Sequence, residues 1–162
     1  MKKALLLPST FLLLLSLCLT YSFGQQKEKT KETLEPDKIP TIVINSLKAK
    51  FPKAEIHKWT KEKEDNIVIY DIEFMQEAKN YAADIKENGT IYNWEKEIAE
   101  NDLPATVRQA VDTKYPKCTL KEIMQVTAVK DGKDELEGYE IIIETEDNNE
   151  TEITLSPDGT LM

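Results

Sequence analysis

Histidine, cysteine and glycine are scarce in this 162-residue sequence, which has one histidine, two cysteines and five glycines. Because His57 is the only histidine, one chain cannot assemble a His-rich metal site or a catalytic triad that uses histidine. The sequence also has no glycine-rich phosphate loop and no nucleophile elbow. These absences predict a protein that is not an enzyme and that uses no cofactor.

A long apolar run is found only at the N-terminus. Lys2 and Lys3 precede an apolar stretch over residues 4–19, and the small residues Ser22 and Gly24 follow it. This pattern is typical of a signal peptide cleaved after Gly24, so residues 1–24 predict export to the periplasm or secretion. The mature chain is then expected to have no transmembrane span.

Two other fates of the leader stay open. Residues 15–18 resemble a lipobox, which would make Cys18 a lipid-modified N-terminus, although Leu17 occupies a position where such boxes carry a small residue. An uncleaved signal anchor is the second alternative. If Cys18 is removed, Cys118 is the one cysteine left, and we expect it to be a small buried apolar residue.

Acidic side chains outnumber basic ones by 30 to 21, which gives a formal net charge of −9. Loss of Lys2 and Lys3 with the leader changes this charge to −11. Such a surface repels phosphate backbones, and no basic cluster interleaved with aromatic residues offsets the repulsion, so we expect no nucleic-acid partner. The charge fits either a basic protein partner or a role in solubility alone.

The chain after the leader consists of a polar segment and two similar segments. Residues 25–38 are charged and nearly free of apolar side chains, which predicts a flexible tether. Residues 39–98 and 99–162 then carry the same marks in the same order, namely Pro40 and Pro104, Pro52 and Pro116, Tyr70 and Tyr139, and Gly89 and Gly159. The offset between them grows from 64 to 70 residues, so the second copy has insertions near residues 129–138. We predict a tandem repeat whose two copies pack together.

Each copy predicts one short helix followed by strands. Apolar residues at every fourth position form one side of a helix, with Ile39, Val43, Leu47 and Phe51 in the first copy and Leu103, Val107, Val111 and Tyr115 in the second. The following residues alternate between apolar and polar, which is typical of antiparallel strands covered by helix on one face. The glycine turns should bring Ile85 opposite Ile91 and Leu155 opposite Leu161. The predicted fold class is α+β, with two repeats of a helix and about four antiparallel strands and both helices on one face.

These structural marks resemble the PepSY-like family, which is grouped with β-lactamase-inhibitor-protein-like folds and is typically exported by bacteria. The likeness covers residues 39–162, but its motifs carry no chemistry. The resemblance implies a non-enzymatic protein, and relatives include propeptide domains that restrain peptidases and an inhibitor that grips a β-lactamase with a concave sheet. This chain lacks the paired cysteines of that inhibitor, so fold alone is the basis of the analogy.

The alternation predicts apolar and aromatic side chains on the sheet face that no helix covers. A Trp- and Tyr-containing patch of this kind suits protein binding. The candidate protein-binding residues are His57, Trp59, Tyr92, Trp94, Ile123 and Ile142. Packing in the core or between the repeats is the alternative, because a one-residue slip would turn Tyr92 and Trp94 inward. For His57, the plain interpretation is a solvated side chain.

The leading hypothesis is an exported binding module that recognises another envelope or secreted protein, such as a peptidase or other hydrolase, through this face. The alternative is a small-ligand or calcium sensor that holds its ligand in acidic loops or in the groove between the repeats. One such loop contains Asp131, Asp134, Glu135 and Glu137, and a second contains Glu144, Glu146 and Asp147. Neither has the spacing of an EF-hand, so we expect solvated loops and assign no metal ligand.

Overall fold

The computed structural model describes residues 28–30, 38–64 and 66–162. The predicted signal peptide, its cleavage site and Cys18 lie outside these residues. Within the described ranges, neither helix combines the length and the apolar character of a membrane span.

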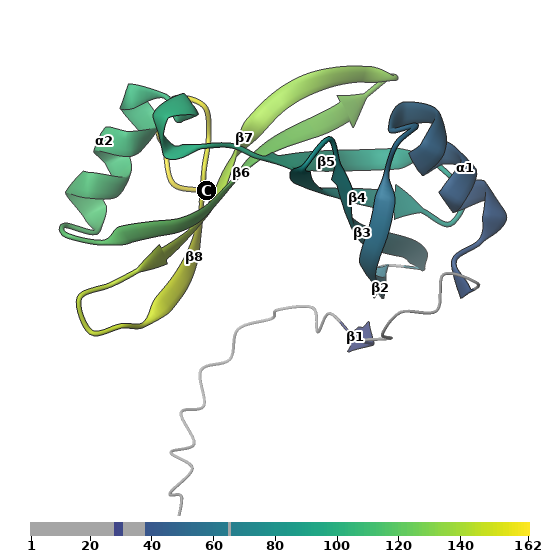
Figure 1. Cartoon of the computed structure of the whole chain (residues 1–162), viewed down its shortest axis with the longest axis horizontal. Coiled ribbons are helices and arrows are strands. Elements are labelled where there is room, and N and C mark those ends of the chain that lie inside the picture. The colour runs from purple at the N-terminus through teal and green to yellow at the C-terminus, as the bar shows by residue number, and fades with distance from the viewer. Residues whose placement is uncertain (1–27, 31–37, 65) are drawn as a thin grey trace, which may run out of the picture.

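One antiparallel sheet joins all eight strands of the described chain in sequence order. The N-terminal unit consists of α1 (Thr41–Lys50), β2 (Glu55–Glu64), β3 (Ile67–Gln76), β4 (Lys79–Lys86) and β5 (Ile91–Glu97). After the 3-10 helix η2 (Glu100–Asp102), the C-terminal unit consists of α2 (Ala105–Lys114), β6 (Thr119–Lys130), β7 (Lys133–Glu144) and β8 (Glu150–Leu155). Strands β5 and β6 pair directly, so the sheet runs without a break through both units. The two helices lie at opposite ends of the molecule (Figure 1).

Both helices pack their predicted apolar side onto the sheet. Pro40 and Pro104 are the N-cap residues of α1 and α2, and Phe51 and Tyr115 are the C-cap residues, each followed by proline. Proline fits a helix start because the first turn has no partner for its missing N–H. The apolar side predicted for α1 is buried at all of its positions. The apolar side predicted for α2 is buried except at Tyr115, which is half-buried. The α+β fold class is therefore confirmed.

Each unit has its own apolar core on the helix-covered side. The core of the N-terminal unit is rich in aromatic residues, since the Phe51 ring lies 4.9 Å from Phe74, 5.7 Å from Tyr81 and 5.6 Å from Trp94, measured between centroids. The core of the C-terminal unit is mainly aliphatic. Cys118 is half-buried and packs against this second core, as an apolar residue would.

The two glycine turns each press against the helix of their unit. Gly89 and Gly159 both have φ +86°, a conformation that L-residues with a side chain rarely adopt. A Cβ on Gly89 would lie 2.7 Å from Ser46 Oγ, and one on Gly159 would lie 2.9 Å from the backbone oxygen of Thr106. The turns bring Ile85 opposite Ile91 and Leu155 opposite Leu161, as predicted.

One short element lies within the predicted tether. Glu28–Thr30 forms β1, which pairs antiparallel with the outer edge of β2. The prediction of a flexible segment differs from the structure at these three residues. In the register of this pairing, Lys29 is opposite Glu62 and Glu28 is opposite Lys63.

The predicted insertion lengthens the β6–β7 hairpin. Its turn at Asp131 and Gly132 extends past β5 toward α1 (Figure 1). There, Lys50 Nζ of α1 lies 2.8 Å from Asp134 Oδ1 and 5.4 Å from the ring centroid of Trp94. The hairpin thus joins the C-terminal unit to the helix of the N-terminal unit.

Candidate functional site

A β-bulge at the start of β2 decides which side chains reach the uncovered face. Ile56 pairs with Phe74 and Lys58 pairs with Glu73, which leaves His57 as an extra residue. Since sheet side chains alternate with period two, the extra residue reverses the phase of everything after it. Trp59 therefore points to the helix-covered side, where it is buried, and its prediction as an exposed binding residue is wrong.

A similar β-bulge lies at the start of β6. Leu120 pairs with Ile143 and Glu122 with Ile142, so Lys121 is the extra residue. Ile123 consequently belongs to the buried core of the C-terminal unit, and its predicted place on the uncovered face is also wrong.

A third bulge separates the two aromatic residues of β5. Asp84 pairs with Asn93 and Ile85 pairs with Ile91, which leaves Tyr92 unpaired. Tyr92 and Asn93 both face the uncovered side, whereas Trp94 packs against the N-terminal core. The outward orientation predicted for Tyr92 is confirmed. For Trp94 the outward orientation is wrong, and the alternative of packing in the core is confirmed.

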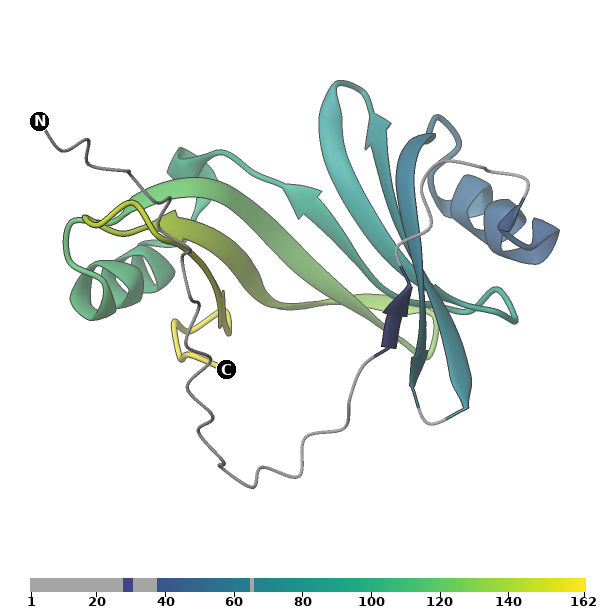
Figure 2. The same cartoon turned by 90° about the horizontal axis from the view of Figure 1, so that it is seen from below.

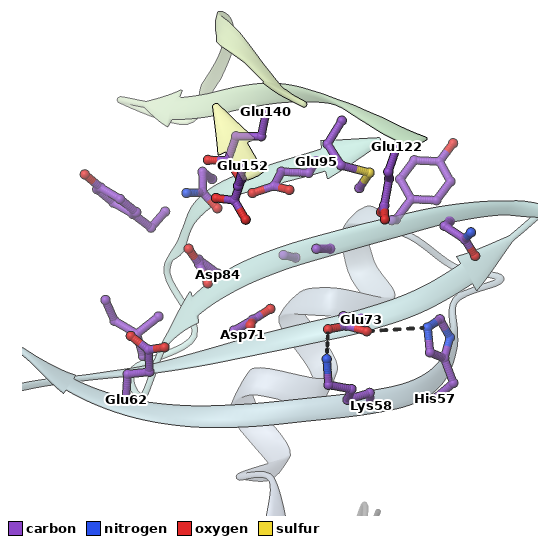
Figure 3. Close-up of a pocket in the computed structure, with 18 of the residues that line it drawn as sticks. His57, Lys58, Glu62, Asp71, Glu73, Asp84, Glu95, Glu122, Glu140 and Glu152 are labelled. Atoms are coloured by element: carbon purple, nitrogen blue, oxygen red, sulfur yellow. Dashed lines mark hydrogen bonds and ion pairs between the residues drawn. The ribbon is translucent and has the colours of Figure 1, made fainter. Parts of the chain in front are cut away.

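The uncovered face is concave and encloses a hollow of about 960 Å³. Of the predicted residues, His57, Tyr92 and Ile142 line it. Its most numerous lining groups are carboxylates from both units (Figure 3), namely Glu62, Asp71, Glu73, Asp84, Glu95, Glu122, Glu140 and Glu152. In the same view α1 lies on the other side of the sheet. We call this surface the concave acidic face.

Glu95 on β5 shows how strongly these carboxylates interact. Burial is the main cause that raises its pKa, and the negative charges of Glu140, Asp84, Asp71 and Glu152 add to it, so the pKa reaches about 8. Two of these charges belong to the N-terminal unit and two to the C-terminal unit. Glu95 therefore holds a proton at neutral pH.

The pKa values of two other carboxyl groups on this face are raised as well. Burial, followed by the charges of other carboxylates, also raises the pKa of Glu122 and of Glu140. Basic side chains among the lining residues lie at one rim, where Lys58 Nζ pairs with Glu73 and His57 Nε2 lies 3.9 Å from Glu73 Oε2. The centre of the face is thus rich in acidic groups that burial and mutual repulsion keep from ionising freely.

Sequence reasoning overlooked this acidic surface, although part of its signal was present. The alternation in β3 and β7 already puts Asp71, Glu73 and Glu140 on the uncovered side. An exposed acidic strand face is the usual interpretation of that pattern. Only the curvature of the sheet turns these separate carboxylates toward one another.

The acidic loops of the calcium hypothesis are engaged in other contacts. Asp134 pairs with Lys50 and Glu135 Oε2 lies 3.5 Å from Lys130 Nζ. In the second loop, Glu144 pairs with Lys121 and Glu146 with Lys117. Over residues 28–30, 38–64 and 66–162, no three His, Cys, Asp or Glu side chains form a group suited to hold a metal ion.

No protein-family model matches this chain, and no curated protein matches it. Solved structures do share its fold. A putative periplasmic protein of Bacteroides eggerthii superposes with a TM-score of 0.60 at 16% identity, covering 76% of this chain and 85% of that one. A DUF2874 family protein of Bacteroides uniformis gives 0.59 at 14%, covering 76% and 86%. A BLIP-like protein of Bacteroides fragilis gives 0.53 at 18%, covering 76% and 82%. The chain therefore has a fold similar to that of BLIP-like proteins.

Proposed function

We propose that this protein is a non-enzymatic, exported binding module that holds a basic segment of another protein on its concave acidic face. The observation that carries the proposal is the hollow itself, which collects eight carboxylates on the sheet face that neither α1 nor α2 covers. A partner with lysine or arginine side chains would relieve the repulsion among these groups. Charge complementarity of this kind gives specificity and speeds association.

The face also offers apolar contact beside the charges. Tyr92 is 54% exposed and is held by Lys86, whose Nζ lies 5.2 Å from the centroid of its ring. The half-buried Ile69 and Ile142 line the same hollow. An exposed tyrosine near acidic groups suits a partner whose basic side chains carry long aliphatic stems.

The proposed location is the periplasm. It rests on the predicted leader, and it agrees with the description of the Bacteroides eggerthii neighbour as a putative periplasmic protein. The net negative charge and the curved, helix-free sheet face are compatible with a partner such as an exported hydrolase. A more specific version of this proposal is that the protein inhibits such a partner.

Descent from a duplicated PepSY-like unit is a further part of the proposal. Its support is that corresponding features of both units recur at a fixed spacing. The first bulge is at His57 in one unit and at Lys121 in the other, and the glycine turns contact α1 near Ser46 and α2 near Ala110. Each of these pairs, 57 with 121 and 46 with 110, repeats the offset of 64 residues found in the sequence.

The charge of the concave acidic face can be tested with a fluorescent deca-lysine peptide as a probe. We expect the triple variant Asp71→Asn, Asp84→Asn, Glu152→Gln to weaken its binding about tenfold or more at low salt, because about 1–3 kcal/mol of charge attraction is lost. Fluorescence anisotropy measures the dissociation constant. A deca-glutamate peptide should not bind.

The matched control removes three exposed carboxylates that do not line the hollow, in the variant Glu77→Gln, Glu87→Gln, Asp131→Asn. Both triple variants change the net charge by the same amount, so long-range attraction falls equally in both. Equal losses of affinity would show that only net charge matters and would refute the proposed site. No binding by the unaltered protein would refute the proposed function.

Tyr92 provides a test of the apolar contact with the same peptide. Tyr92→Ala should weaken binding about three- to tenfold, since an exposed aromatic residue at an interface contributes roughly 1 kcal/mol. Ile42, 51% exposed on α1, is a control of similar exposure on the helix-covered side. Equal affinities of the Tyr92→Ala and Ile42→Ala variants would remove Tyr92 from the site.

A further inference from the structure

The concave acidic face brings together carboxylates from strands that are far apart in the sheet. Glu95 lies on β5, next to the β5–β6 junction of the two units. Asp71 of β3 and Asp84 of β4 approach it from the N-terminal side, and Glu140 of β7 and Glu152 of β8 from the C-terminal side (Figure 3). The curl of the sheet, visible in Figure 2, is what makes these groups neighbours.

The junction between the units is the pairing of β5 with β6. These strands are paired over the five residues 93–97, as many positions as β4 with β5 and fewer than β2 with β3 or β6 with β7. The ion pair of Lys50 on α1 with Asp134 on β7 also spans the units. A change of twist at β5 and β6 would therefore move one unit relative to the other.

We propose that the curl of the sheet is a pH-dependent device, in which ionisation of the concave acidic face drives the two units apart and protonation lets them close. Repulsion among the carboxylates of β3, β4, β7 and β8 acts across the hollow. Glu95 is the central group, because charges from both units act on it. The proposal concerns the free protein and does not depend on the proposed function.

The direction of the effect follows from proton linkage. Closure keeps the pKa of Glu95 at about 8, above the ordinary value of 4.5, so the closed form retains a proton that a more open form releases. Below the ordinary value both forms are protonated and pH has no effect through this group. As pH rises toward 8 and beyond, the open form is favoured, and each pKa unit relieved by opening multiplies the open-to-closed ratio about tenfold.

Other charged groups on the concave acidic face either add to the repulsion among the carboxylates or compensate part of it. The pKa values of Glu122 on β6 and Glu140 on β7 are also raised by burial and by neighbouring carboxylates, so their ionisation adds to the opening force. Lys58 and His57 on β2 contact Glu73 at the rim, and Lys86 on β4 lies over Tyr92. Lys58 thus compensates the charge of Glu73 at the edge of the face, whereas the charges that raise the pKa of Glu95 are all carboxylates.

Distances between the units provide the test. Spin labels on cysteines introduced at the exposed Lys79 and Thr151, in a Cys118→Ala background, report one distance from β4 to β8 by pulsed electron resonance. We expect the distance distribution to shift to longer values between about pH 6 and about pH 9, while far-UV circular dichroism stays unchanged. Identical distributions at both pH values would refute the proposal.

Two variants connect the shift to the central carboxyl. Glu95→Gln keeps the shape of the side chain but cannot ionise, so the shift should shrink to less than half, and Glu140→Gln should reduce it less. Glu87→Gln, at an exposed turn outside the hollow, should leave it intact. A full shift in Glu95→Gln would refute the role of Glu95, and carbon NMR titration of Glu95 with an ordinary pKa would do the same.

Discussion

The N-terminal and C-terminal units share one plan but stabilise it with different side chains. In the N-terminal unit, the residue that ends the helix is the buried Phe51, which contacts the rings of Phe74, Tyr81 and Trp94. In the C-terminal unit, the equivalent Tyr115 is half-buried beside an aliphatic core. The plan therefore depends on where apolar side chains lie, and the identity of the side chains is free to differ.

The two units also contribute different parts to the junction between them. The β6–β7 hairpin of the C-terminal unit is the longer one, and its Asp134 contacts Lys50 of α1. Trp94, on the last strand of the N-terminal unit, fills the space between Phe51 and that contact. The aromatic core of the first unit thus extends to the boundary, where it supports the curled sheet that forms the concave acidic face.

The largest expected effect comes from truncating the two residues that end the helices. Phe51→Ala should lower the free energy of unfolding by about 3–5 kcal/mol, because it leaves a cavity among three rings. Tyr115→Ala should lower it by about 1–2 kcal/mol, because the side chain is only partly buried. Urea denaturation followed by circular dichroism measures both values. Equal losses would mean that the two cores are equivalent and would contradict the comparison.

A smaller difference is expected at the glycine turns. Gly159→Ala should cost about 2–3 kcal/mol, because its Cβ would meet the backbone oxygen of Thr106, which cannot move aside. Gly89→Ala should cost about 1–2 kcal/mol, because the nearest atom is the hydroxyl of Ser46, which can rotate. Thermal melts of the two variants rank them directly.

A control at the first turn separates crowding from backbone strain. Adding Ser46→Ala to Gly89→Ala removes the closest contact but leaves the positive φ. The double variant should recover part of the lost stability relative to Ser46→Ala alone. A Gly89→Ala variant that is less stable than Gly159→Ala would show that the side-chain contact at Ser46 is more rigid than the backbone at Thr106.

The local sequence was sufficient to predict the helices, the strands and their order along the chain. The four-residue spacing of Val43 and Leu47, and of Val107 and Val111, predicted both helices and their buried sides. The alternation after Pro52 and Pro116 predicted antiparallel strands, and the Asn-Gly and Asp-Gly dipeptides predicted the turns. These features depend on residues close together in the chain, where the backbone geometry of helices, strands and turns fixes the pattern.

The orientation of individual side chains was decided by pairing with distant strands. The bulges at His57, Tyr92 and Lys121 depend on how each strand pairs with its neighbour. Each bulge reverses the sheet face to which the later residues of its strand point. For this reason Trp59, Trp94 and Ile123 lie on the helix-covered side. Single strands showed acidic residues on the uncovered face, but their gathering around one hollow was likewise invisible in any one strand.

By itself, the sequence determined which segments fold into helices and strands, since that choice depends on the period of apolar residues along the chain. The tertiary structure alone decided which residues meet. Strand pairing set the phase of each side chain, and the curl of one continuous sheet brought Glu95 together with carboxylates of both units. Charge repulsion acts through space, so its effect on Glu95 appears only once the sheet has curved.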